Sequence, residues 1–255
     1  MQATPENLTA LRQLLQASFI QTDNSKRKEA ESTLNSIQGQ PGFSLVVLHL
    51  ITLLSAAVAG VDVAIRQSAS VLFKNLVKRR WHSDDEEEQP NLIVAGDRET
   101  IKTHLVELMV SAPPDVQRQL AEAVTIISKY DFPEKWGGLL PQLVGKLASQ
   151  DLTVTKGVML TTNSIMKRFR YVFKTEQLMG ELKYCLDGFQ EPLLVSFRTN
   201  FATICQAGSN KAGLEVAMET HRLMSRIYFS LNWQDIPEYF EDNIDEYCQT
   251  SLVKL

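Results

Sequence analysis

The sequence predicts an all-helical fold, a superhelical solenoid of HEAT repeats of the armadillo type. Apolar residues recur at helical spacing throughout, and no segment shows the period-two alternation of a strand. Prolines mark the starts of helices at Pro5, Pro41, Pro133 and Pro237. The shorter helix pairs match the roughly 40–47 residues of HEAT and armadillo repeats. So many short-looped pairs favour a stacked array over the alternative, a single helical bundle.

The first pair of helices is expected at residues 5–19 and 26–38. Thr4 can cap the first helix, and Pro5 suits its opening position because a missing N–H costs nothing there. One face of each helix is expected to point into the core. The residues of these two faces are Leu8, Leu11, Leu15 and Phe19, then Ala30, Leu34 and Ile37.

The next helix, expected at residues 43–60, is strongly apolar. It approaches the roughly 20 residues that a membrane span needs. However, His49, Thr52 and two serines interrupt it, and basic flanking residues are missing. A helix buried on nearly all sides within a helical array explains it better. Its partner is expected at residues 63–81, with Asp62 as N-cap and an inward face of Ile65, Ala69, Leu72, Phe73 and Leu76.

Residues 82–96 interrupt this pattern with an acidic run at 84–88, whose mutual repulsion predicts a solvated loop. Asp97 is expected to cap the helix that follows, and Pro113-Pro114 ends that helix. In the next helix the inward face is expected to hold Val116, Leu120, Ala123, Val124 and Ile127. Its outward face is expected to hold Gln117, Arg118, Glu122 and Lys129.

Another pair starts at Asp131-Phe132-Pro133, and later helices are expected at residues 152–169, 176–207, 211–231 and 238–255. Pro192 is expected to kink or split the longest of them. The last helix stays amphipathic with no polar capping helix after it, so we expect the repeats to continue beyond residue 255. The expected domains are HEAT repeats one and two at 1–81, the acidic loop at 82–96, and further, truncated repeats at 97–255.

Composition argues against several classes of function. A net charge of −4 does not suit a nucleic-acid binder, which usually shows a strongly basic face. The three cysteines, Cys185, Cys205 and Cys248, are far apart and are expected to be free, buried thiols in a reducing compartment. Because no metal-ligand spacing, phosphate-binding loop or nucleophile motif occurs, we expect no metal, no cofactor and no enzymatic activity. The three tryptophans are expected to anchor the core.

Two stretches carry a family resemblance: RQSASVLFKNLVKRRW at Arg66–Trp81 and DFPEKWGGLLPQL at Asp131–Leu143. Both resemble the N-terminal HEAT repeats of the importin-β superfamily of nuclear transport receptors. A third stretch, Ser164–Phe197, resembles the branch of this family that returns importin-α to the cytoplasm. The resemblance covers nearly the whole chain.

This resemblance implies a monomeric receptor that shuttles between nucleus and cytoplasm through the nuclear pore. It would bind the GTP form of the small GTPase Ran through its N-terminal repeats and export importin-α as cargo. Nucleoporins are further candidate partners, whereas nucleic acid and membrane insertion are not expected.

The candidate partner-binding residues lie on the second helix of each of the first three pairs. One basic cluster stands near the end of the helix at 63–81 and consists of Lys74, Lys78, Arg79 and Arg80, with Asn75 beside it as a possible hydrogen-bonding partner. It suits an acidic protein surface; the alternative is a solvated helix end, where cations are favourable near the negative end of the helix dipole. The remaining candidates, for which a chance solvated face is the alternative, are Arg27, Glu31, Asn35, Gln117 and Glu122.

Two other functions stay open at this point. Repeat architecture does not fix the direction of transport, so a different importin or exportin of the same family is one alternative. A HEAT scaffold of a regulatory complex, such as a phosphatase scaffold, is the other, and it would bind its partners without regard to GTP.

Overall fold

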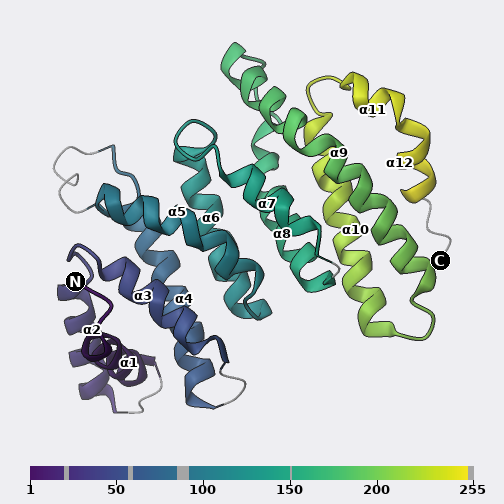
Figure 1. The fold of residues 1–255 in the computed structure, drawn as a ribbon. Coiled ribbons are helices and arrows are strands. Elements are labelled where there is room, and N and C mark those ends of the chain that lie inside the picture. Colours follow the sequence, from purple (N-terminus) through teal and green to yellow (C-terminus); the bar gives the residue numbers. More distant parts are fainter. Residues whose placement is uncertain (20–22, 57–59, 85–91, 150, 252–255) are drawn as a thin grey trace. The chain divides into compact units, whose positions relative to one another are not determined.

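The computed structural model describes residues 1–19, 23–56, 60–84, 92–149 and 151–251 (Figure 1). These residues form helices joined by turns and hold no strand, which confirms the all-helical prediction. Contacts divide the chain into two compact units, Met1–Tyr130 and Asp131–Leu255. The acidic residues at 85–88 and the last apolar residues, 252–255, lie outside the described part of the chain.

The first unit stacks its helices in pairs. Its elements are α1 (Pro5–Phe19), α2 (Asn24–Ile37), α3 (Phe43–Leu53), the short 3₁₀ turn η1 (Leu54–Ala56), α4 (Val61–Arg80), α5 (Ala95–Val110) and α6 (Pro114–Asp131). Helix α1 packs on α2, and α3 packs on α4. Helix α3 also contacts α1 and α5, so the first helices of successive pairs lie side by side in one layer.

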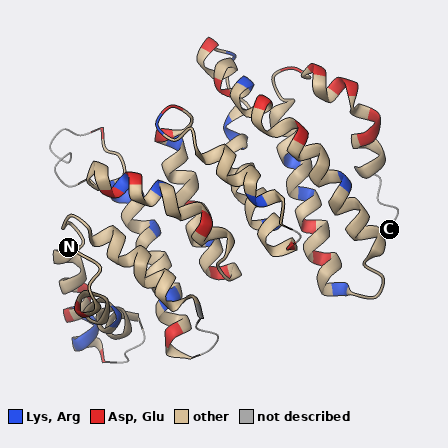
Figure 2. Cartoon of the chain, viewed as in Figure 1, with Lys and Arg blue, Asp and Glu red and all other residues tan. Residues whose placement is uncertain are grey.

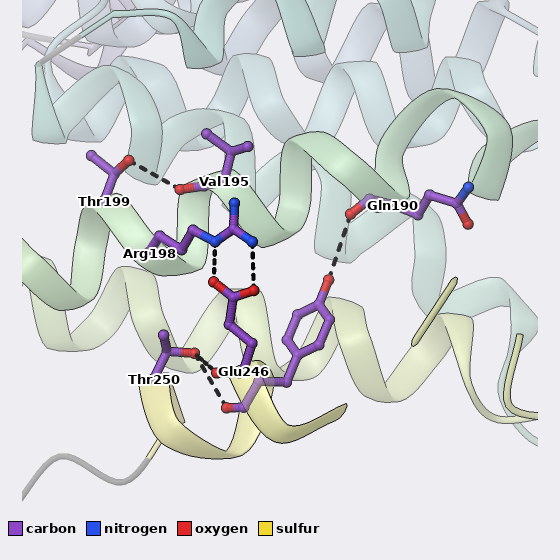
Figure 3. A network of polar contacts seen from close by, with 7 residues as sticks. Gln190, Val195, Arg198, Thr199, Glu246 and Thr250 are labelled. Carbon is purple, nitrogen blue, oxygen red and sulfur yellow. Dashed lines mark hydrogen bonds and ion pairs between the residues drawn. The ribbon is translucent and has the colours of Figure 1, made fainter. Parts of the chain in front are cut away.

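The second unit repeats this arrangement. Its elements are α7 (Leu139–Leu147), α8 (Leu152–Met166), the 3₁₀ turn η3 (Lys167–Phe169), α9 (Glu176–Gln206), α10 (Lys211–Leu231), α11 (Glu238–Asp242) and α12 (Ile244–Ser251). Helix α7 contacts α9, and α8 contacts α10 along much of its length, which gives two layers of helices. Helix α12 is fastened to α9 by the ion pair between Arg198 and Glu246 (Figure 3).

Polar side chains cap several helices as their types predict. The Thr4 hydroxyl accepts a hydrogen bond from the Asn7 N–H at 3.3 Å, which confirms the expected cap of α1. Two expected caps are wrong. Asp62 lies inside the first turn of α4 and pairs with Arg12. Asp97 lies inside α5, and its carboxylate accepts the Gly42 N–H at 2.7 Å, so it caps the start of α3 instead.

The DFPEKW segment has a structural role at the start of the second unit. Phe132 and Trp136 are buried, with 5% and 4% of their surface exposed. The Phe132 carbonyl accepts a hydrogen bond from Arg168 at 3.2 Å. The Gly137 carbonyl accepts one from the Tyr184 hydroxyl at 2.6 Å. These bonds tie the approach to α7 to η3 and α9, so this motif helps to hold the repeats together.

The predicted inward faces are largely confirmed. Leu11, Phe73 and Leu120 are buried, as are nearly all of the residues expected to share their faces. Phe19 is an error, because it ends α1 with 54% of its surface exposed while Ser18 takes the buried place. The prediction that Trp233 anchors the core is also wrong, because 37% of its surface is exposed. Helix α10 ends at Leu231, so Trp233 falls in the following turn.

The apolar stretch after residue 43 is one short helix and not the single helix expected at 43–60. Helix α3 ends at Leu53 and passes into η1. Seven of its eleven residues are buried, which confirms that it is an interior helix of the array. No helix in the described part of the chain is both long and apolar enough to cross a membrane.

Two expectations for the C-terminal helices need correction. Of the kink or split expected at Pro192, the split is wrong, because α9 continues through this residue. The helix expected at 238–255 is divided at Asn243 into α11 and α12. The Asn243 side-chain amide donates to the Tyr239 carbonyl at 2.7 Å, while its own carbonyl accepts the Tyr247 N–H at 3.2 Å. This local bonding ends one helix and begins the next.

Candidate functional site

Helix α2 presents its three candidate residues on one exposed face. Arg27, Glu31 and Asn35 follow one another at four-residue spacing, so they share that face. Arg27 and Glu31 form an ion pair of 3.8 Å, with 46% and 53% of their side chains exposed. An exposed pair of this kind contributes about 0.3–0.5 kcal/mol, so both charges stay available to a partner.

The basic cluster lies at the C-terminal end of α4. Lys78 and Arg79 are exposed, whereas Lys74 and Asn75 are half-buried. The last turn of α4 holds three successive basic residues, because Arg80 follows this pair. Cations here complement the negative end of the helix dipole, which stabilises the helix.

The structure joins α2 and α4 through a residue that the sequence did not single out. Arg79 donates from Nη2 to the Gln38 side-chain oxygen at 3.0 Å and from Nε to the Asn75 carbonyl at 3.3 Å. Gln38 in turn donates to the Asn35 side-chain oxygen at 2.8 Å. Three candidates from two helices therefore form one polar cluster around Gln38, which we call the α2–α4 cluster: Asn35, Gln38, Asn75 and Arg79.

Helix α6 divides its two candidates. Glu122 is exposed as expected. Gln117, expected on the outward face, is only 5% exposed, and its Nε2 has no hydrogen-bond partner among the described residues. The buried arc of α6 is wider than a narrow stripe, so it includes Gln117 as well as its neighbour Val116. In the described chain, no hydrogen bond links Gln117 or Glu122 to the α2–α4 cluster.

Charge on these helices is mixed: the cations of α2 lie near its start, whereas those of α4 include three in its last turn. Figure 2 shows Lys and Arg beside Asp and Glu on α2. The exposed side chains that this surface offers are long, charged and hydrogen-bonding, and lie on rigid helices. Such a surface can recognise a folded protein with an acidic patch, and its charges raise the rate of association more than the final affinity.

The described residues contain no group of three or more His, Cys, Asp or Glu that could hold a metal ion. Burial raises the pKa of the Cys185 thiol to about 12, so little of it is thiolate near neutral pH. Cys205 and Cys248 are exposed, which corrects the expectation that all three thiols are buried.

Two family models match the chain. The model described as the importin-beta N-terminal domain matches residues 30–111, a segment that includes Asn35 and all of α4. The model described as Cse1 matches residues 165–255. The first match therefore includes the α2–α4 cluster, and the second includes α9 to α12.

Curated relatives named exportin-2 align with the whole chain. The exportin-2 of Drosophila melanogaster is 37% identical over 255 residues, which is 100% of this chain and 26% of the relative. The human exportin-2 is 36% identical over 245 residues, or 96% of this chain and 24% of the relative. The chain thus spans about a quarter of the length of the curated relatives it matches.

Two solved structures have the same fold. The exportin Cse1 in its cargo-free, cytoplasmic state matches with a TM-score of 0.83 and 32% identity, covering 96% of this chain and 25% of that one. Yeast importin-beta matches with a TM-score of 0.64 and 16% identity, covering 97% of this chain and 27% of that one. The second likeness shows the helical solenoid fold alone.

Proposed function

The chain belongs to the importin-β superfamily and is similar to exportin-2 over its whole length. From this premise we propose that it is part of a nuclear export receptor. The receptor binds Ran in its GTP form together with importin-α and carries importin-α from nucleus to cytoplasm. The alignment with exportin-2 at 37% identity over all 255 residues is the observation that carries this proposal.

In this proposal the chain binds and does not catalyse. The nucleotide belongs to Ran, and hydrolysis on Ran releases the cargo. The receptor shuttles between the two compartments and meets nucleoporins on the way. No metal or cofactor takes part.

The α2–α4 cluster and its neighbours Lys74 and Lys78 are the proposed contact surface for Ran. The hydrogen bonds of Arg79 to Gln38 and Asn75 hold its guanidinium in place, so little rotamer entropy is lost when a partner binds. Lys78 is exposed beside it and offers a second cation. Arg27 and Glu31 on α2, and Glu122 on α6, are candidates for the edge of this contact.

Importin-α and Ran-GTP are proposed to strengthen each other's binding. In a repeat array each repeat contacts only its neighbours along the chain, so the array deforms readily. The first ligand must therefore order the array, and the second finds part of that ordering already done. Thermodynamic linkage makes the effect equal in both directions.

A pull-down with purified Ran tests the contact surface. The immobilised chain is offered Ran loaded with a non-hydrolysable GTP analogue or with GDP, each with and without importin-α, and we expect retention of the GTP form alone. The double charge reversal Lys78→Glu and Arg79→Glu is expected to weaken retention about tenfold or more, the equivalent of about 1.4 kcal/mol.

A matched control reverses two exposed lysines of the second unit, Lys183→Glu and Lys211→Glu, and should bind like the unaltered chain. Equal retention of both nucleotide forms would favour the generic HEAT scaffold. Selective binding of Ran-GTP that importin-α weakens would favour an import receptor.

A further inference from the structure

A groove of about 760 Å³ lies in the second unit, where the end of α7 and the start of α8 face the middle of α9. Its apolar wall includes Leu147, Leu152, Pro192 and Val195. This volume falls within the roughly 300–1,000 Å³ of typical ligand pockets. Figure 3 shows the Val195 side chain pointing away from Glu246 of α12, so the groove lies on a separate face of α9.

Four of the hydroxyl groups that line the groove are left to accept hydrogen bonds from a ligand. Thr155, Ser196, Thr199 and Thr203 each donate to the carbonyl four residues earlier in the chain, at 2.7–3.1 Å. Each hydroxyl has a single proton, which these bonds use, and its lone pairs remain. The groove therefore offers several acceptors along one side of α9.

Asn200, also among the lining residues, has a buried side chain behind this wall of the groove. Its side chain is 3% exposed, and its Nδ2 donates to the Ala217 carbonyl of α10 at 3.0 Å. This bond directs the amide nitrogen toward α10, and Oδ1 is left buried with no hydrogen-bond partner among the described residues. An orphaned buried oxygen of this kind costs about 1–3 kcal/mol.

Among the described residues that line the groove, the charge is negative. Glu191 is exposed at its edge and makes no ion pair within the described part of the chain. No lining residue that the structure describes is basic. A carboxylate, several acceptors and an aliphatic wall are together complementary to a cation with an aliphatic stem, as in a Lys or Arg side chain.

We propose that this groove binds an extended peptide segment in which a Lys or Arg side chain stands next to an aliphatic side chain. The cationic head reaches Glu191 and the threonine oxygens, and the aliphatic neighbour packs on Leu147, Leu152 and Val195. The site is separate from the α2–α4 cluster, and the proposal does not depend on Ran or importin-α.

Fluorescence anisotropy with a labelled pentapeptide, Gly-Leu-Arg-Leu-Gly with blocked ends, tests this groove on the full 255-residue chain. The matched probe replaces Arg with citrulline, which keeps the shape and removes the charge. We expect the Arg peptide to bind about tenfold or more tightly than the citrulline peptide. Amide NMR shifts on titration should map to Thr199 and Asn200.

Glu191→Gln is expected to weaken the Arg peptide about tenfold, whereas Glu215→Gln on α10, the same change at an exposed site outside the groove, should leave it unchanged. Thr199→Val removes one acceptor at nearly constant volume and should also weaken binding, with an unchanged circular dichroism melt as the check on folding. Equal binding of the two peptides, no binding of either, or shifts that map elsewhere would overturn the proposal.

Discussion

Arg66 and His221 are polar residues that lie almost wholly inside their units. Arg66 is 3% exposed and donates from Nε to the Ile51 carbonyl at 3.1 Å, close to the end of α3. His221 is 7% exposed and stands edge-on to Phe197, with ring centroids 5.1 Å apart. Desolvation lowers the pKa of both groups, because burial disfavours the charged form of a base.

Arg66→Ala is expected to lower the free energy of unfolding by about 2–3 kcal/mol, because it removes a charge-assisted bond at a helix end and leaves a void. Arg12→Ala is the contrasting variant. Its side chain is 47% exposed and pairs with Asp62, so its removal should cost under about 1 kcal/mol. Urea denaturation followed by circular dichroism measures both. Equal losses would contradict the buried role of Arg66.

His221 is expected to make the stability of the second unit depend on pH. Because its folded pKa lies below its ordinary value of 6.5, the unfolded chain takes up a proton more readily than the folded chain. Stability should therefore fall as pH falls from about 6.5 through the lower folded pKa, and then level off as far as this group is concerned. Urea midpoints at half-unit pH steps test this, and His221→Phe should remove that part of the slope.

At the scale of elements, residue spacing predicted which segments are helical but not where each one ends. The spacing of Leu8, Leu11 and Leu15 identified α1, because burial enforces the helical period. Helix ends depend on contacts made in space. Asp97 has the right type for a cap of its own helix, yet its carboxylate accepts a hydrogen bond from the Gly42 N–H, 55 residues away in the sequence. Asn243 divides the last helix through a local bond that no apolar pattern reveals.

The candidate site was predictable to a similar degree. Lys78 and Arg79 stand out in sequence, and they are exposed as expected. The role of Gln38 was not predictable. It accepts a hydrogen bond from Arg79, which lies 41 residues later in the sequence, and this bond forms only because the ends of α2 and α4 lie close together. Gln117 was placed on the wrong face, because a polar residue beside an apolar stripe gives no signal of how wide the buried arc is.

The attachment of α12 to α9 gives a prediction at this scale. The hydrogen bond from Arg198 lowers the pKa of Glu246 below its ordinary value of 4.5. A carboxylate with a lowered pKa stabilises the fold above its unfolded pKa, and this contribution is lost as pH falls through the lower folded value. Hydrogen exchange of α12 amides should therefore quicken in Glu246→Gln at neutral pH, and the difference from the unaltered chain should fade in acid.

Helix α12 also contacts α9 through the Tyr247 ring, which stacks edge-on to Phe197 at 5.1 Å. Glu241→Gln is a matched control, since Glu241 is exposed on α11. It should leave the exchange of α12 unchanged. Unaltered exchange in Glu246→Gln would show that apolar packing alone holds α12 in place.

At the scale of the whole molecule, the chain combines two proposed binding surfaces on a repeating helical frame. The α2–α4 cluster lies in the first unit and the acceptor-lined groove in the second. Helices of a repeat array are positioned by their neighbours, so partner-facing side chains can vary while the buried layers keep the fold. This explains how 16% identity to yeast importin-beta accompanies a shared fold.

The most direct measurement uses a chimaera in which this chain replaces the aligned quarter of Drosophila exportin-2. The affinity for Ran carrying a non-hydrolysable GTP analogue is measured with and without importin-α, beside unaltered exportin-2. We expect the chimaera to bind Ran-GTP, to discriminate against Ran-GDP, and to bind more tightly when importin-α is present. A folded chimaera that binds no Ran-GTP, or binds it equally with and without importin-α while exportin-2 does not, would contradict the assignment as an export receptor.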